Sequence, residues 1–221
     1  MCASYESRFS VRQLVDAFAH AGIEVGMDGG GLPNLEPREE VRPTDTDRIV
    51  RATPDGPDRA RLAPARFGLK ASAPKRPPVI NLRSEGRGIS NAGTSGRALL
   101  PVSGFYEFTG DTYPKTRWRL SDAGGAVLML ACVWRAGVGA CGEEEADGFA
   151  LLTGEPGPDI APYHSRGVIP LPPAAWADWL FDRVPAADLL MPPPAGTLIA
   201  TAAPRASAAR DTTPSPTLFD L

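Results

Sequence analysis

The sequence predicts a domain to which helices and antiparallel strands both contribute. Three observations carry this prediction: a capped amphipathic segment at residues 10–21, strand-like stretches between residues 79 and 153, and a second, proline-led helix at residues 172–181. With 221 residues and 43% hydrophobic content, the chain can bury one sizeable core, or two small ones. We expect a single domain at residues 1–200, followed by a disordered tail at residues 201–221 that is rich in Ala, Pro, Ser and Thr.

The first helix has a recognisable beginning and end. Ser10 and Gln13 have the spacing of a capping box, in which each side chain bonds the backbone amide of the other residue. Apolar residues then recur at helical spacing as far as Phe18, and Gly22 is a natural stop.

The segment from residue 22 to residue 64 is rich in Gly, Pro and Asp. We expect a loop there, interrupted by one short strand near residues 48–51. The glycine run at residues 29–31 lacks the lysine and Ser/Thr of a phosphate loop, so it indicates flexibility only. Arginines follow at residues 59–61 and 66–69, a pattern typical of solvated charge that would also suit a phosphate backbone.

Two of the expected strands carry polar groups. Alternation over residues 79–85 places Asn81 and Arg83 on one face, which is either half-solvated or lines a polar pocket. In the strand expected at residues 99–108, Glu107 is surrounded by apolar and aromatic residues. Such a setting raises the pKa of a carboxyl group toward the range useful for proton transfer. Glu107 is therefore either one half of a buried ion pair with an arginine or a general acid–base group.

A hairpin is expected next, with strands at residues 116–121 and 126–134 joined by a turn at residues 122–125. An exposed acidic loop at residues 138–148 and a strand at residues 149–153 follow. His164 then lies in a short loop before an apolar strand, where it is either structural or an acid–base group.

Composition argues against several classes of protein. No apolar run is long enough to span a bilayer, and the polar start argues against a secretory signal. The cysteines Cys2, Cys132 and Cys141 have neither paired spacing nor histidines at metal-ligand distance, so we expect a reducing compartment, no structural metal and no cofactor. The net charge of −3 argues against a generic nucleic-acid binder, although it is compatible with a local basic groove.

Cys2 has chemistry of its own if Met1 is removed, as an initiator Met before a small residue normally is. The residue then presents an α-amine and a thiol on adjacent carbons. An aldehyde condenses with the amine to a Schiff base, and the thiol closes a stable five-membered thiazolidine. On position alone, the alternative is an incidental residue at a frayed terminus.

Five pieces of the chain, in this order and spacing, resemble the SOS-response-associated peptidase family. They are Met1-Cys2, INLRSE at residues 80–85, LPVSGFYE at residues 100–107, ACVW at residues 131–134, and the loop around His164. The resemblance runs from residue 1 to about residue 183. It implies an α+β fold with an open, barrel-like antiparallel β core and flanking helices. It also implies a reaction with abasic sites in single-stranded DNA, which the protein senses and shields.

By matching position, the resemblance assigns roles to single residues. Cys2 would be the covalent nucleophile, which forms a thiazolidine crosslink with the ring-opened deoxyribose. Glu107 would assist proton transfer, and His164 would act on the sugar oxygen and aid reversal. Asn81 and Arg83 would hold the abasic sugar and its adjacent phosphate. The remaining expected DNA contacts are Arg166, Phe67 and Trp118. Family members commonly have Gly-Arg after the cysteine, where this chain has Ala3-Ser4, so one cationic contact is missing.

We expect a monomer that binds abasic single-stranded DNA in the cytoplasm, at the nucleoid and not at a membrane. Leu218-Phe219 in the tail resembles peptides that dock on bacterial sliding clamps. Two other functions are compatible with the sequence. One is a thiol-dependent peptidase or amidase that processes its own N-terminus, and the other is a non-covalent single-stranded DNA binder.

Overall fold

The computed structural model describes residues 2–27, 35–54, 56, 58–71, 73, 75–138 and 144–204. The helices are α1 (Val11–His20), α2 (Pro173–Leu180) and α3 (Ala186–Leu189). The strands are β1 (Tyr5–Ser7), β2 (Glu24–Met27), β3 (Arg38–Val41), β4 (Thr46–Ala52), β5 (Arg59–Phe67), β6 (Asn81–Arg83), β7 (Ser95–Val102), β8 (Gly104–Thr109), β9 (Thr116–Asp122), β10 (Leu128–Val138), β11 (Glu144–Gly154), β12 (Gly167–Val168) and β13 (Leu198–Ala202).

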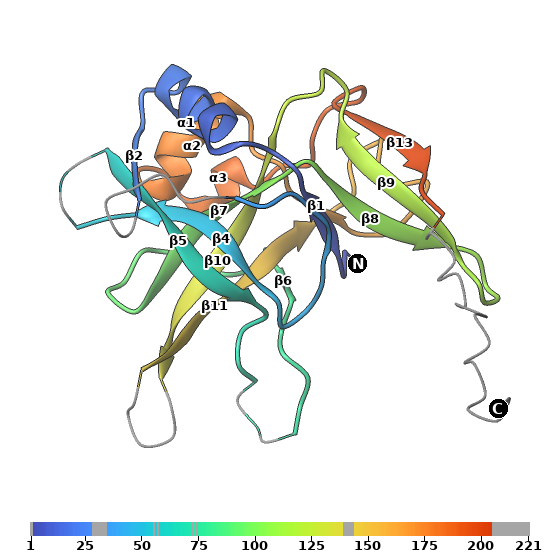
Figure 1. Ribbon diagram of the computed structural model, residues 1–221, viewed down its shortest axis with the longest axis horizontal. Coiled ribbons are helices and arrows are strands. Elements are labelled where there is room, and N and C mark those ends of the chain that lie inside the picture. Colours follow the sequence, from blue (N-terminus) through green and yellow to red (C-terminus); the bar gives the residue numbers. More distant parts are fainter. Residues whose placement is uncertain are drawn as a thin grey trace, which may run out of the picture.

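Two sheets form the β core (Figure 1). The smaller has the order β13-β9-β8-β1-β3, and the larger has the order β12-β11-β10-β7-β4-β5-β2, with β6 added beside β11. A short parallel pairing, Gly148 with Arg66 and Phe149 with Phe67, joins β11 to β5 and closes a ring of hydrogen bonds through β4, β7 and β10. The helices gather on one side of the larger sheet. The predicted α+β fold with a largely antiparallel β core and flanking helices is confirmed.

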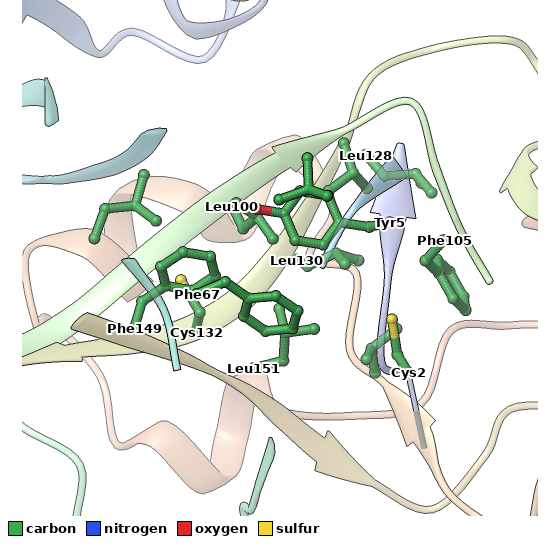
Figure 2. Packing of buried hydrophobic residues seen from close by; sticks show 14 of the residues in the cluster. Cys2, Tyr5, Phe67, Leu100, Phe105, Leu128, Leu130, Cys132, Phe149 and Leu151 are labelled. Atoms are coloured by element: carbon green, nitrogen blue, oxygen red, sulfur yellow. The ribbon is translucent and has the colours of Figure 1, made fainter. Parts of the chain in front are cut away.

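Alternate residues of the ring strands supply two buried clusters, as the side-chain period of a strand requires. Leu100 and Leu130 belong to the first cluster, and Leu99 and Met129 belong to the second. The first cluster also takes in Cys2, Tyr5, Phe67, Phe105 and Phe149 (Figure 2). The second lies under the helices and includes Leu14, Phe18, Trp176 and Trp179. The N-terminal residues are thus part of the packed interior.

Helix α1 forms as predicted. Ser10 Oγ accepts a hydrogen bond from the Gln13 amide at 3.2 Å, and Gln13 Oε1 accepts one from the Ser10 amide at 2.8 Å. Leu14 and Phe18 are the buried positions, and the Phe18 ring packs on Trp176 of α2. Gly22 has a φ of +71°, a conformation that glycine adopts without strain. Helix α2, with Pro173 at its first position, is also confirmed.

The strand predicted near residues 48–51 is part of β4, but the loop predicted around it is wrong, because β2, β3 and most of β5 also lie between residues 22 and 64. The first β5 residues do alternate: Ala60 and Leu62 are buried, whereas Arg59 is exposed and Arg61 is partly exposed. Alanine and arginine have weak strand preference, so the alternation was masked by composition. The glycine run at residues 29–31 lies outside the described residues.

The hairpin predicted over residues 116–134 is also wrong. Both strands exist, but β9 pairs with β8 and β13, whereas β10 pairs with β7 and β11. The turn between them therefore carries the chain from one sheet to the other, and Asp122 fixes it by accepting hydrogen bonds from the amides of Gly124 and Ala126. Alternation shows that a segment is a strand and does not identify its partner.

The strand expected at residues 99–108 is divided at Ser103, where the chain passes from β7 in the larger sheet to β8 in the smaller. Gly104 permits this crossing, since a Cβ at that position would lie 2.9 Å from the Leu120 carbonyl oxygen. The division matters for function because it places Glu107 in the smaller sheet, beside the N-terminal strand β1.

The remaining predictions differ in their extents. Strand β10 continues to residue 138 and β11 begins at residue 144, so much of the predicted acidic loop is strand, and residues 139–143 with Cys141 lie outside the described residues. Strand β13 extends to Ala202, just past the predicted end of the domain. Residues 205–221, including Leu218-Phe219, lie outside the described part. Among the described helices, none is long and apolar enough to cross a membrane.

Candidate active site at the N-terminus

The chain is held in place at Cys2 through both its side chain and its backbone. The thiol is fully buried, with Sγ 3.3 Å from the Ser4 carbonyl oxygen. Asn81 Nδ2, on β6, donates a 2.8 Å hydrogen bond to the Cys2 carbonyl oxygen. The Ser4 carbonyl also accepts a bond from the Tyr106 amide of β8. Figure 2 shows Cys2 at the Phe105 end of the first cluster. These contacts show that the chain is ordered at Cys2 and is not frayed there.

The environment of Cys2 keeps its thiol protonated at neutral pH. Burial raises the pKa of the Cys2 thiol to about 12, and the negative charge of Glu107 adds to the rise. Backbone hydrogen bonds with Ser4 and Tyr106 oppose the shift without cancelling it. The nucleophilic thiolate therefore forms only if a nearby base accepts the proton as the sulfur reacts.

Glu107 has the properties of such a base. It lies on β8 opposite Trp118 of β9, and it is 2% exposed. Burial raises the pKa of the Glu107 carboxyl to about 7, and the positive charge of the chain's N-terminus limits the rise. A carboxyl group with this pKa exchanges a proton readily at neutral pH, as the sequence predicted.

Asn81 approaches the same place from the larger sheet. Asn81 pairs with Leu151, where β6 lies parallel to β11. While Nδ2 bonds the Cys2 carbonyl, the buried Oδ1 accepts no hydrogen bond from the described residues. The side chain thus fixes the Cys2 backbone and keeps an acceptor available beside it.

His164 lies in a tight turn that follows residues 157–163. Its Nδ1 is 3.0 Å from both the amide nitrogen and the carbonyl oxygen of Arg166. The contact with the amide requires Nδ1 to accept and Nε2 to carry the hydrogen, whereas the contact with the carbonyl requires Nδ1 to donate, so the two contacts are compatible with either tautomer. Burial lowers the pKa of His164, and the positive charge of the N-terminus lowers it further. The lowered pKa favours the neutral ring near pH 7, in which one nitrogen donates and the other accepts.

An aromatic pair connects Glu107 to His164. The half-buried Trp118 contacts Tyr163, with ring centroids 5.1 Å apart, and its Nε1 donates to Thr109 Oγ1 at 2.8 Å. Sequence reasoning identified Trp118 and missed Tyr163, although an aromatic residue directly before a candidate histidine was the available signal.

The two predicted arginines differ in their surroundings. Arg83 is exposed at the end of β6. Arg166 Nη2 donates to Glu85 Oε2 at 2.8 Å and to the Thr153 carbonyl oxygen at 2.6 Å. Arg166 therefore links the His164 turn to β11 and to the end of β6, and its guanidinium is already bonded to groups of the protein. Arg8, the first arginine after Ala3-Ser4, faces Glu6 and Glu39.

Phe67, which is expected to contact DNA, lies in the packed core. Phe67 is fully buried, stacked on Phe149 at 5.2 Å and edge-on to Tyr5 at 5.4 Å. Figure 2 places it at the end of the cluster away from Cys2. The β5–β11 pairing that closes the ring turns this side chain inward. In the described residues, no group of three or more His, Cys, Asp or Glu side chains is arranged to hold a metal ion.

Comparison with known proteins agrees with this architecture. Three solved structures share the fold: a Bordetella bronchiseptica protein (TM-score 0.70, 24% identity, 92% of this chain and 100% of that one), a Bacteroides thetaiotaomicron protein (0.66, 14%, 91% and 92%) and a phage-related protein from Bordetella bronchiseptica (0.65, 20%, 91% and 94%). Among curated proteins, no sequence match is found. The family model described as SOS response associated peptidase (SRAP) matches residues 1–204. The chain belongs to the SRAP family.

Proposed function

We propose that the chain, once Met1 is removed, forms a covalent thiazolidine crosslink with abasic sites in single-stranded DNA through Cys2. Family membership supports a role connected with DNA damage. The observation that carries the finer proposal is the contact of distant segments around Cys2. Asn81 Nδ2 of β6 bonds the Cys2 carbonyl at 2.8 Å, and the negative charge of the buried Glu107 on β8 raises the pKa of the Cys2 thiol. Trp118, which pairs with Glu107, contacts Tyr163 directly before His164.

The first stage opens the sugar and captures the aldehyde. The Glu107 carboxylate takes the proton of the C1 hydroxyl of the abasic deoxyribose and passes it to the ring oxygen, which the His164 ring polarises by a hydrogen bond, so the ring C–O bond breaks, the aldehyde forms and the carboxylate is restored. The α-amine of Cys2 adds to the aldehyde carbon, and loss of water leaves the Schiff base. Asn81 supports this stage by holding the Cys2 backbone at 2.8 Å.

The second stage uses the thiol. With the pKa of the Cys2 thiol at about 12, the S–H bond does not ionise unaided at neutral pH. Glu107 accepts the thiol proton as sulfur adds to the imine carbon, and the same proton is delivered to the imine nitrogen. One C–S bond forms, the C=N bond becomes single, and no phosphodiester is broken. The product is a five-membered ring that links protein to DNA.

The test mixes the protein with end-labelled single-stranded DNA containing one abasic site and looks for a shifted band on a denaturing gel. The band is expected for the natural sequence and is expected to disappear in Cys2→Ala or when an extra residue precedes Cys2. Cys132→Ala is the matched control, since Cys132 is equally buried in the same cluster. A band that survives Cys2→Ala would overturn the thiazolidine mechanism.

Cys2→Ser separates the two stages. It keeps the amine and loses the thiol, so borohydride should still trap a Schiff base while the untreated crosslink becomes labile. The alternatives give different results. Peptide cleavage without any crosslink would favour the thiol-dependent peptidase or amidase, and retained DNA affinity without crosslink or cleavage would favour the non-covalent binder.

A further inference from the structure

A cavity of about 930 Å³ lies away from the Cys2 site, between the helices and the start of β10. Its walls come from four segments: the outer face of α1, residues 122–129, residues 170–176 and residues 188–197. Cys2, Glu107 and His164 do not line it. Its volume is within the range of cavities that bind ligands, and the residues that form it are not needed for the crosslinking chemistry.

Prolines make the cavity rigid and apolar. Pro170, Pro172, Pro173, Pro192, Pro193 and Pro194 line it together with Leu128, Leu171, Trp176 and Met191. The segment that follows Pro192, Pro193 and Pro194 is held in place, because Asp159 accepts hydrogen bonds from the amides of Gly196 and Leu198. Gly157 lies so close to Pro193 that a Cβ there would approach the Pro193 carbonyl oxygen to 2.5 Å. The walls of a preformed cavity of this kind do not have to become ordered when a ligand binds, so that entropic cost is avoided.

The rim of the cavity is acidic. Asp16, Asp122 and Asp188 line it, and no Lys or Arg is found among the described residues that do. Proline has no backbone N–H, so the six prolines contribute no backbone donors. An occupant with apolar groups and a positive charge complements this surface, whereas the DNA backbone is repelled by it.

A second cavity of about 650 Å³ adjoins the first, with Gln13, Asp122, Gly125, Ala126 and Val127 lining both. It is more polar and reaches Glu6, Arg8 and Arg119. Arg119 Nε is already bonded to Glu6 Oε2 at 2.5 Å, and Arg8 faces the same carboxylate. The two cavities form one elongated groove with an apolar end and a polar end, a shape that fits a chain segment better than a single small molecule.

We propose that this groove binds a short segment of a partner protein, in which large apolar residues enter the proline-walled cavity and adjacent basic residues meet the acidic rim. Met191, with 62% of its surface exposed, forms a flexible edge that can adapt to the apolar side chain. The partner is thereby brought to the same protein that carries the Cys2 site without competing for it.

The test uses two fluorescein-labelled nonapeptides that share two leucines and a phenylalanine. One carries two arginines, and the other carries glutamates in their place. Fluorescence anisotropy at about 0.15 M salt should show binding of the arginine peptide and at least about tenfold weaker binding of the glutamate peptide. The double variant Asp16→Lys, Asp188→Lys should weaken the arginine peptide at least about tenfold, and Met191→Glu should weaken binding of the glutamate peptide further. Asp111→Lys, an exposed change outside the groove, should not alter binding.

All variants should keep their crosslinking rate with abasic DNA within about twofold, which also shows that they fold. Equal binding of the two peptides, or no binding of either up to about 1 mM, would overturn the proposal. Removal of residues 205–221 should leave the affinity unchanged. A gain of more than about tenfold on removal would assign the groove to the chain's own tail and would equally overturn it.

Discussion

The side-chain amide of Asn81 holds the backbone of Cys2, donating a 2.8 Å hydrogen bond from Nδ2 to the Cys2 carbonyl oxygen. The bond connects β6 of the larger sheet to the segment that leads into β1 of the smaller one. It fixes the carbonyl of the residue whose amine and thiol are proposed to react. Asn81 was expected to hold the substrate sugar, and in this structure its side-chain amide bonds the Cys2 backbone.

Asn81→Asp should therefore slow crosslinking without weakening DNA binding. The aspartate keeps the size of asparagine and loses the donor, so two acceptor oxygens face each other at the Cys2 carbonyl. A lost buried hydrogen bond of this kind costs about 1–3 kcal/mol, and a tenfold or greater fall in rate is expected. Single-turnover crosslinking measures the rate, and anisotropy with undamaged single-stranded DNA measures the affinity. A wild-type rate in this variant would contradict the orienting role.

Crosslinking by the natural sequence should change with pH around 7. The burial that raises the pKa of Glu107 to about 7 makes the group half-ionised there, and only the carboxylate can accept the thiol proton. The rate constant should rise through this pH and level off above it. Glu107→Gln should be slower at every pH and should lack this inflection. An inflection near pH 7 that persists in Glu107→Gln would assign it to another group.

The same carboxyl group should make the fold less stable as pH rises. Glu107 has a folded pKa of about 7 against an ordinary value of 4.5, so the folded state retains its proton where the unfolded chain has lost it. The destabilisation is absent below about pH 4.5, grows between pH 4.5 and 7, and is complete above, at roughly 3 kcal/mol. Glu107→Gln should raise Tm at pH 8 and leave it nearly unchanged at pH 4. The exposed Glu155→Gln should show no such dependence.

How far the sequence predicts the structure depends on whether a feature is local. The α1 cap, the proline-led α2 and the carboxyl group in an apolar strand depend on neighbours in the chain, and each was predicted correctly. Strand partners depend on distant residues. Residues 116–121 and 126–134 were correctly identified as strands and wrongly paired, because one turn at Asp122 carries the chain between sheets.

The residues of the proposed site were named from the sequence, whereas their arrangement was only partly predictable. Family resemblance named Cys2, Asn81, Glu107 and His164, and the structure brings their segments together. The resemblance could not show that Phe67 is buried whereas Trp118 is half-buried. Phe67 turns inward because Phe149 pairs with it across β5 and β11, a contact between residues far apart in the sequence.

Arg83 should contribute to DNA affinity mainly through charge. It is exposed at the end of β6, so it can reach a phosphate, whereas Arg166 is held by Glu85 and Thr153. Arg83→Gln should weaken binding to all single-stranded sequences alike and should reduce the slope of log affinity against log salt by about 0.7. Arg12→Gln, an exposed change on α1, is the control and should leave the slope unaltered. An unchanged slope in Arg83→Gln would exclude a phosphate contact.

Trp118 and Phe67 should separate stacking on DNA from packing in the core. Trp118 is half-buried beside Tyr163, so Trp118→Ala should weaken binding to single-stranded DNA by the roughly 1–3 kcal/mol of one stacked base. Phe67 is sealed between Phe149 and Tyr5, so Phe67→Leu should lower Tm through lost packing and leave the DNA affinity of the folded protein unchanged. Thermal unfolding and anisotropy, measured on the same samples well below Tm, distinguish the two effects. If Phe67→Leu weakened DNA binding as much as Trp118→Ala, the ring would have to leave the core to meet the DNA, contrary to its packing here.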